Sequence, residues 1–373
     1  MIFHLLSRWQ PPSPLSDDTD IHKTLIVGFP SGDKRLAFSQ MEALTGLATK
    51  DEWDVEYLGL TNDPFIKTNY PHHEGLWSWG NQADQVVLVM RDLRSTLVEY
   101  HDILWDIGYA KTYSESISLK DRLYTDRPPL GDFLDWRDMR VLDEIHWYGW
   151  YIDYWMEGGL MRDIFSHKLT TPEHWNMLLK PTEYKKNEIA YDFIVGGKVV
   201  TPSYDPHCIN DLSGGCEPVA IISAEHLVEY DTGPSETRKI ANILLKSRGI
   251  SDYVIKEDAW ECVWRELIVK KKGLKTSLDR EGSREQSYNF SQEMLEAMMS
   301  ELDRLITKYI SVEWESVQVA PNLVELLLEH RRVIHQELTE IVSGERRLKN
   351  NDFLGPNTRA RMAMEMTEKN LYW

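Results

Sequence analysis

Short apolar runs alternate with longer stretches of helical spacing in the first third of the chain. Residues 24–29 and 85–90 are almost continuously apolar, which is typical of strands buried on both faces of a parallel sheet, and the short run at 65–68 between them is strand-like. The runs at 24–29 and 85–90 lead into stretches of helical periodicity, at residues 35–47 and 93–109. This alternation predicts an α/β fold with a central, mainly parallel sheet flanked by helices.

The same pattern returns later in the chain. Residues 219–223 predict another buried strand, and residues 235–246 predict the helix that follows it. The last third of the chain has helical periodicity almost throughout. Its predicted helices cover residues 257–272, 291–309 and 321–344.

The middle of the chain, residues 111–217, follows a different pattern. It contains an aromatic-rich helical stretch at 133–165 and a predicted hairpin at 193–200 around a Gly-Gly turn. We interpret this region as an insertion on the substrate side of the α/β domain. The predicted organisation is a lead-in at 1–22, one α/β domain at 23–310 that includes this insertion, and a helical C-terminal extension at 311–373.

The composition narrows the class of protein. The chain has 42 basic and 60 acidic side chains and a formal charge of −18, which argues against a nucleic-acid or anionic-membrane surface because such surfaces need clustered Lys and Arg. We expect no membrane span, since no run of about 18 apolar residues is present. Three cysteines are too few for disulfide bonds to stabilise a chain of 373 residues, so we expect reduced thiols in a cytoplasmic protein.

The first candidate for chemistry is the segment 28–34, Gly-Phe-Pro-Ser-Gly-Asp-Lys, between a predicted strand and a predicted helix. Backbone N–H groups at such a turn, a helix N-terminus and a Lys can together cradle an anion. The spacing is not that of the Walker loop of nucleotide phosphatases. An ordinary strand-to-helix turn is the alternative interpretation.

Two cations follow at the ends of the next two predicted strands. Lys67 lies near the carboxyl end of its strand, where α/β folds place ligands, although an exposed strand-end Lys is the alternative. Arg91 directly follows an apolar strand and precedes a helix, where a guanidinium can bind a phosphate through two hydrogen bonds. A salt bridge to a local carboxylate is the alternative for Arg91.

Taken in order, these three segments resemble the sulfotransferase superfamily that uses 3′-phosphoadenosine 5′-phosphosulfate (PAPS). In that family a strand leads into a Pro-Lys-Ser-Gly-Thr-Thr or Pro-Gly-Ser-Gly-Asn-Thr loop, a Lys-Thr-His segment follows, and a Val-rich strand ends in Arg-Asn-Pro-x-Asp. The corresponding segments here are Phe-Pro-Ser-Gly-Asp-Lys at 29–34, Lys-Thr-Asn-Tyr-Pro at 67–71 and Val-Met-Arg-Asp-Leu-Arg-Ser at 89–95. Residues 222–244 and 279–291 are similar to later segments of the family.

The resemblance implies a P-loop-like fold and transfer of a sulfuryl group from PAPS to a hydroxyl or nitrogen of a small-molecule acceptor, with no metal. Lys34 and Lys67 would stabilise the transferring group, because in-line displacement is accelerated mainly by positioning and by cations. Arg91, Arg280 and the Gly282 backbone would bind the 3′-phosphate. The implied cofactor ligands are Ser31, Gly32, Asp33, Lys34, Arg35, Arg91, Ser95, Arg280 and Gly282.

Two departures from the family concern cofactor binding. The loop that binds the phosphosulfate is one residue short and lacks its usual Lys, so Lys34 or Arg35 would supply the positive charge. Glu99 stands where the family has a Ser that helps to bind the 3′-phosphate, and Ser95 or Thr96 would take that role. The loop beginning at residue 280 shows the first of these departures too, since it is also one residue short.

A third departure concerns the base. The family's catalytic His corresponds to Asn69, whose amide cannot accept a proton, so His72 or His73 would act instead. Together with Glu99 and the shortened loop, this residue favours a second hypothesis: a binding or scaffold protein that has the fold without transfer activity. A P-loop-like kinase is a third hypothesis, from topology alone, although the chain lacks a full Walker loop and a clear Mg²⁺ aspartate.

The aromatic stretch at residues 147–155 bears on the identity of the acceptor. It predicts either protein core or the wall of a pocket for an aromatic or cationic acceptor. Acidic side chains of the same predicted helix, among them Glu144 and Asp153, predict a solvated helix face or contacts to a cationic acceptor. The C-terminal helices carry apolar faces for the chain's own core or for an oligomer. Those faces include Leu323, Leu326 and Leu327.

Overall fold

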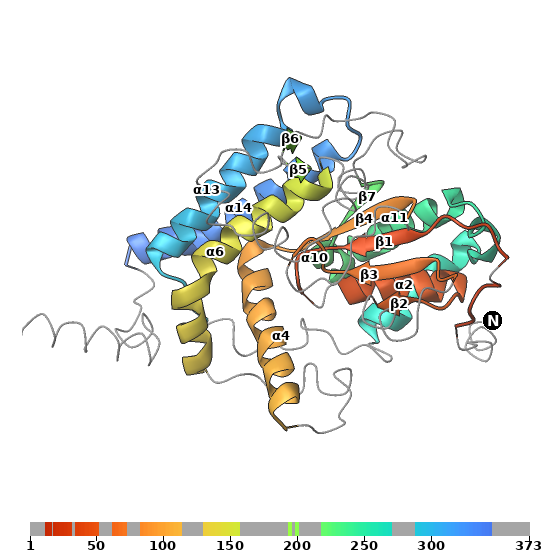
Figure 1. Cartoon of the computed structure of the whole chain (residues 1–373), viewed down its shortest axis with the longest axis horizontal. Helices are drawn as coiled ribbons and strands as arrows, with labels where there is room; N and C mark the ends of the chain where they lie inside the picture. The colour runs from red at the N-terminus through yellow and green to blue at the C-terminus, as the bar shows by residue number, and fades with distance from the viewer. Residues whose placement is uncertain are drawn as a thin grey trace, which may run out of the picture. The chain divides into compact units, whose positions relative to one another are not determined.

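The computed structural model places most of the chain in two compact units (Figure 1). The residues that the structure describes are 12–16, 18–31, 34–51, 62–72, 83–113, 130–156, 193–195, 198–200, 218–270 and 288–344. Unit 1 comprises residues 1–91, 151–274 and 315–322, and unit 2 comprises residues 92–150, 275–314 and 323–373. The domain boundaries expected at residues 23 and 310 stay predictions.

Unit 1 contains a five-stranded sheet in which all neighbouring strands are parallel. Its order is β2 (Lys50–Asp51), β3 (Phe65–Thr68), β1 (Thr24–Val27), β4 (Gln85–Met90) and β7 (Ala220–Ser223). Every residue of β1 and β4 is buried, which explains why their sequences are apolar without alternation. The expected α/β class with a central parallel sheet and flanking helices is therefore confirmed.

The hairpin predicted at residues 193–200 is confirmed as well. Strands β5 (Phe193–Val195) and β6 (Lys198–Val200) pair antiparallel, with Val195 opposite Lys198. They form a separate two-stranded sheet, which does not pair with the five-stranded one.

Two helices of unit 1, α2 (Lys34–Thr45) and α11 (Gly233–Lys246), pack against each other along one face of the sheet (Figure 1). The apolar positions of α2 that helical spacing predicts to face inward, Leu36, Met41 and Leu44, are all buried. The predicted helix at 257–272 is divided into three shorter elements. The remaining short elements are α10 (Ala224–Val228), the 3-10 turns η1 (Ser251–Tyr253) and η2 (Glu257–Ala259), α12 (Trp260–Trp264) and the π-helical turn η3 (Arg265–Val269).

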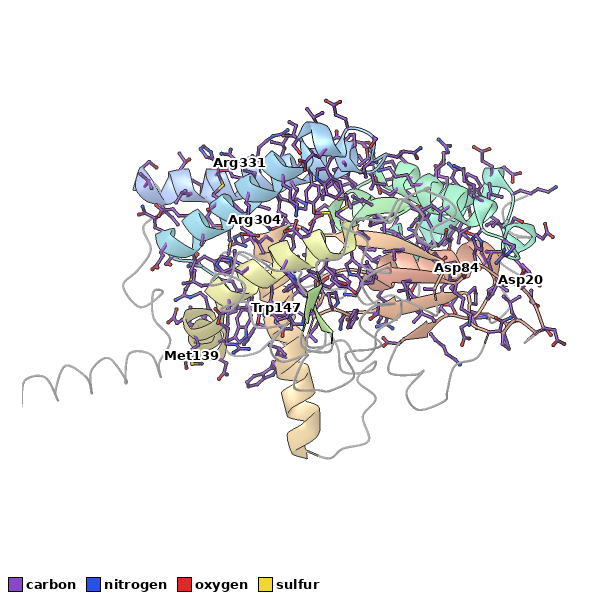
Figure 2. All side chains as sticks on the ribbon, turned by 45° about the horizontal axis from the view of Figure 1, so that its top comes forward. Asp20, Asp84, Met139, Trp147, Arg304 and Arg331 are labelled. Atoms are coloured by element: carbon purple, nitrogen blue, oxygen red, sulfur yellow. The ribbon has the colours of Figure 1, made fainter. Side chains whose placement is uncertain are left out.

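The amino edge of the sheet is held by polar side chains. Asp84 accepts a hydrogen bond from the backbone N–H of Lys23 at 2.8 Å, and the Gln85 side-chain amide donates to Ser247 Oγ at 2.8 Å. Figure 2 shows Asp20 and Asp84 at this edge. These contacts fix the starts of β1 and β4 and leave the opposite, carboxyl edge to the loops that follow the strands.

Unit 2 is built from helices. Its elements are α4 (Leu93–Tyr113), the part of α6 (Leu130–Met156) up to residue 150, α13 (Gln292–Tyr309), the turn η5 (Val312–Trp314) and α14 (Ala320–Val342) from residue 323. The helices predicted at 291–309 and 321–344 are thereby confirmed. Among the described residues, no helix is long and apolar enough to cross a membrane.

Two buried arginines anchor the segment that precedes α13. Arg94 on α4 forms an ion pair with Glu337 on α14 and donates to the Tyr288 carbonyl at 2.9 Å. Arg137 on α6 donates to the Asn289 carbonyl. Because both guanidiniums are at most 7% exposed, they satisfy backbone acceptors that water cannot reach, and they join three helices to one short segment.

Helices α13 and α14 are also joined at the surface. Arg331 donates to Asp303 at 2.5 Å, and this hydrogen bond raises the pKa of the Arg331 guanidinium. Arg304, labelled with Arg331 in Figure 2, donates to Glu301 at 2.6 Å. The Glu301 carboxylate is accommodated by Gly149 of α6, where an added Cβ would come within 1.6 Å of Oε1.

The aromatic stretch of α6 is core. Every residue from 147 to 156 is buried, including Trp147, Tyr148, Trp150, Tyr151, Tyr154 and Trp155. The expectation of a solvated acidic face is wrong for Glu144 and Asp153, which are 1% and 0% exposed, because this end of the helix is covered on all sides. Leu323, Leu326 and Leu327 are buried too, which favours the core interpretation of the C-terminal helices.

We predict that Gly233→Ala destabilises unit 1. An added Cβ at this first residue of α11 would lie 2.2 Å from Trp264 Nε1 and 2.7 Å from the Leu227 carbonyl, so it would break the 2.8 Å hydrogen bond between those two groups. The expected loss in the free energy of unfolding is about 2–4 kcal/mol, from overpacking and a lost buried hydrogen bond. Urea denaturation measures it, with the exposed Ser235→Ala as control; equal stability of the two variants would contradict the packing.

Candidate functional site

Because the strands run parallel, their carboxyl ends lie at one edge of the sheet. Val27 of β1 pairs with Thr68 of β3 and with Leu88 of β4, while Met90 of β4 pairs with Ser223 of β7. The loop after β1, the end of β3 and the residues that follow β4 and β7 are therefore neighbours along this edge.

The strand order changes direction at β1. The chain passes from β1 to β2 and β3 on one side, and then to β4 and β7 on the other. Open α/β sheets bind ligands at the carboxyl ends of the strands, at such a topological switch point. We therefore define the carboxyl-edge site as residues 28–31 and Lys34 after β1, the segment 67–72 at the end of β3, and Arg91 after β4.

The loop after β1 begins with a close approach to β4. A Cβ on Gly28 would lie 2.7 Å from the Val89 carbonyl and 3.0 Å from Cγ of Lys34, so only glycine fits at this position without a shift of the backbone. The Lys34 side chain folds back over Gly28. Its ammonium donates to the carbonyls of Gly28 and Phe29, each at 2.9 Å, and approaches the Ser31 carbonyl at 3.5 Å.

Lys34 is 1% exposed, so its ammonium is part of the loop's own structure. A buried charge needs hydrogen-bond acceptors, and here the carbonyls of the loop supply them. The resemblance to sulfotransferases predicts that this cation contacts the transferring sulfuryl group. In the structure, the Lys34 ammonium donates its hydrogen bonds to carbonyls of the loop itself.

An aromatic cluster covers the same loop. The Tyr151 hydroxyl accepts a hydrogen bond from the Gly28 backbone N–H at 2.9 Å. The ring of Phe29 makes edge contacts with His72 at 5.0 Å and with Tyr151 at 6.1 Å between centroids. Sequence reasoning missed Tyr151 as a site residue, since it lies 123 positions from Gly28 and its aromatic neighbours mask it as core.

Lys67 lies on β3, one residue before the strand ends. Its ammonium is 2.6 Å from the Asp51 carboxylate, which is its register partner on β2, and 5.7 Å from the centre of the Phe38 ring. The side chain is 24% exposed. Lys67 is therefore a cation at the ligand edge of the sheet that keeps access to solvent.

Arg91 follows β4 directly and is nearly buried. Its Nε lies 3.9 Å from the carboxylate of Glu225, a residue near the start of α10 with a side chain 30% exposed. Ser223 Oγ lies 3.3 Å from the same carboxylate and caps α10 by accepting from the His226 backbone N–H. The ion pair with a local carboxylate, which the sequence left as an alternative for Arg91, is thus present at the position expected for a phosphate ligand.

The segment after β3 forms a tight turn with a cis peptide bond between Tyr70 and Pro71. The Thr68 hydroxyl accepts from the Tyr70 backbone N–H at 2.9 Å, and the Asn69 carbonyl accepts from the His72 backbone N–H at 3.0 Å. The His72 side chain, a predicted base, is 1% exposed and packs against the loop after β1.

The other predicted ligands are distributed as follows. Ser31 lies in the loop after β1 and Arg35 is partly buried on α2. Ser95 is on α4 in unit 2, where its backbone N–H donates to Asp92 at 2.9 Å, and the buried Glu99 is on the same helix. Five predicted ligands or bases lie outside the described residues: Gly32, Asp33, His73, Arg280 and Gly282.

We predict that Lys34→Met lowers the stability of unit 1. The change removes the ammonium and leaves the buried carbonyls of Gly28 and Phe29 without their donor. We expect a loss of about 2–4 kcal/mol in the free energy of unfolding. The control Lys246→Met removes an exposed lysine of α11 and should change stability by less than about 0.5 kcal/mol. Urea denaturation measures the free energy of unfolding of both variants. Equal values for Lys34→Met and Lys246→Met would show that the Lys34 ammonium does not stabilise the loop.

Among the described residues, no group of three or more His, Cys, Asp or Glu side chains is placed to hold a metal ion. No family model, curated protein or solved structure matches this chain.

Proposed function

We propose that the carboxyl-edge site binds PAPS, and that the protein transfers the sulfuryl group to a hydroxyl or nitrogen of a small-molecule acceptor. The observation that supports this most directly is the parallel register, which brings the loop after β1, Lys67 and Arg91 to adjacent strand ends. These are the three segments whose order resembles the PAPS-dependent sulfotransferases. A topological switch point lies between them.

The reaction we propose is an in-line displacement at sulfur. The acceptor oxygen or nitrogen forms a bond to sulfur while the bond from sulfur to the 5′-phosphate oxygen breaks, and 3′-phosphoadenosine 5′-phosphate leaves. Negative charge grows on the leaving phosphate oxygen, where Lys67 and the amides of the loop closed by Lys34 stabilise it. Arg91 binds the 3′-phosphate. Asn69 cannot take the acceptor's proton, so His72 and His73 are the candidate bases.

The two ion pairs at the edge determine how an anion would enter. Lys67 is paired with Asp51, and Arg91 faces Glu225, so a bound phosphate must share or replace these carboxylates. Both carboxylates are 25–30% exposed and can turn toward water. Because such partly exposed pairs are weak, replacing them costs little, and a multiply charged ligand that contacts both cations gains more.

A binding protein without transfer activity is the second candidate. The observation that favours it is that Lys67 is already satisfied by a carboxylate at 2.6 Å, while Asn69 provides no base. Such a protein would bind the nucleotide and leave its sulfate in place. Binding of 3′-phosphoadenosine 5′-phosphate without sulfate transfer to a broad acceptor panel would support this candidate over the enzyme.

We predict that 3′-phosphoadenosine 5′-phosphate binds with a micromolar or lower dissociation constant in calorimetric titration, and that Arg91→Ala weakens binding at least tenfold. A charge-assisted hydrogen bond to phosphate is worth about 1.5–3 kcal/mol, which corresponds to roughly 10- to 150-fold in affinity. The matched control is Arg248→Ala. Arg248 pairs with Asp20 at the amino edge of the sheet, and its side chain is 56% exposed.

Three outcomes are informative. Equal weakening in both arginine variants would show that the effect is not specific to the carboxyl edge. Unchanged affinity in Arg91→Ala would remove this residue from the site. If the folded wild-type protein does not bind the nucleotide at all, PAPS-dependent transfer is the wrong function.

A further inference from the structure

The end of α6 contacts both loops of the carboxyl-edge site. Residues 151–156 of this helix belong to the same unit as the sheet. Tyr151 accepts a hydrogen bond from Gly28 in the loop after β1, and Trp155 Nε1 donates to the Tyr70 carbonyl in the loop after β3, at 3.2 Å. Both aromatic side chains are 1% exposed. One short stretch of helix therefore ties together two loops that come from distant parts of the sequence.

Both backbone polar groups of Gly28 are held by side chains. Tyr151 accepts from its N–H, and Lys34 donates to its carbonyl at 2.9 Å. The Val89 carbonyl of β4 also lies so close that residue 28 has no room for a Cβ. The two peptide groups that flank Gly28 are thus held by side chains of α6 and α2, beside the backbone of β4.

The spacing along α6 relates one loop to the other. Tyr151 and Trp155 are four residues apart, so they lie on the same face of the helix, and their ring centroids are 6.5 Å apart. The Tyr70 ring also makes an edge contact with Tyr154, at 5.8 Å. A rigid helix thereby sets the distance between the loop after β1 and the loop after β3.

We propose that Tyr151 and Trp155 are positioning residues for the carboxyl-edge site: they hold its two loops in the arrangement that receives the phosphosulfate group. This inference rests on the proposed function for the identity of the ligand, and on the contacts of α6 for the mechanism. Backbone amides bind an anion tightly only when they are already oriented toward it. Neither aromatic residue needs to touch the ligand for this role.

Removing the Tyr151 hydroxyl tests the mechanism. In Tyr151→Phe the ring remains and the Gly28 N–H loses its acceptor, which is costly for a buried amide. The loop then turns toward water and occupies other arrangements. Ligand affinity falls in proportion to the fraction of molecules that keep the competent arrangement.

We predict two measurable effects of Tyr151→Phe. Amide hydrogen exchange in residues 28–31 should accelerate roughly tenfold, while exchange in β1 and β4 stays unchanged, because the loop opens without unfolding the sheet. The affinity for 3′-phosphoadenosine 5′-phosphate should fall by a similar factor. The control Tyr154→Phe removes a hydroxyl from the same buried helix end and keeps the ring that contacts Tyr70. It should change neither quantity more than twofold.

A double-mutant cycle adds a readout that a purely structural role would not produce. Tyr151 and Lys34 hold the two peptide groups on either side of Gly28, so either change alone should release this residue. The losses in affinity caused by Tyr151→Phe and Lys34→Met should therefore be less than additive, whereas independent contributions would add.

The two proposals fail in different ways. Hydrogen exchange requires no ligand, so a wild-type protein that does not bind the nucleotide overturns the proposed function while the positioning of the loop is still tested. Unchanged exchange in residues 28–31 of Tyr151→Phe would overturn the positioning role. Equal acceleration in the loop and in β4 would also overturn it, since it would mean that the hydroxyl only stabilises the unit as a whole.

Discussion

The candidate site depends on the parallel pairing of β1 with β3 on one side and with β4 on the other. This pairing brings Gly28, Lys67 and Arg91 to the same edge, although the three residues are spread over 63 positions of the chain. It also explains the glycine, because the backbone of β4 passes too close to residue 28 for any side chain. A slip of one residue in either pairing would turn the side chains of the shifted strand to the opposite faces of the sheet.

The three cations at this edge have different kinds of partners, and the differences follow from the solvent access of each cation. The Lys34 ammonium is buried, so it requires fixed acceptors and finds them in the loop carbonyls. Lys67 is partly exposed and needs only an exposed carboxylate beside it. Arg91 lies between these cases, with a buried guanidinium facing a partly exposed Glu225. A buried cation can organise a loop, whereas a cation with solvent access can exchange its partner for a ligand.

Unit 2 uses buried arginines for another purpose. Arg94 and Arg137 donate to carbonyls in residues 288–290, a segment without regular secondary structure. A guanidinium can satisfy a carbonyl and a carboxylate at the same time. In both units, therefore, a long basic side chain fixes an irregular segment next to a helix.

Local patterns in the sequence were sufficient for four of the five strands of the sheet, most helices, the hairpin and the parallel arrangement, because apolar runs and helical spacing report burial over a few residues at a time. The two-residue strand β2 was not predicted. They also placed Lys67 and Arg91 at strand ends. Only the tertiary structure decided which partners these residues meet: Asp51 beside Lys67, Glu225 beside Arg91, and the loop carbonyls around Lys34. It also buried Glu144 and Asp153, for which the sequence predicted a solvated helix face or contacts to a cationic acceptor, and brought Tyr151 onto Gly28. The reason is physical, since periodicity shows which face of an element is covered, whereas the identity of the covering residue depends on chain segments up to 123 positions away.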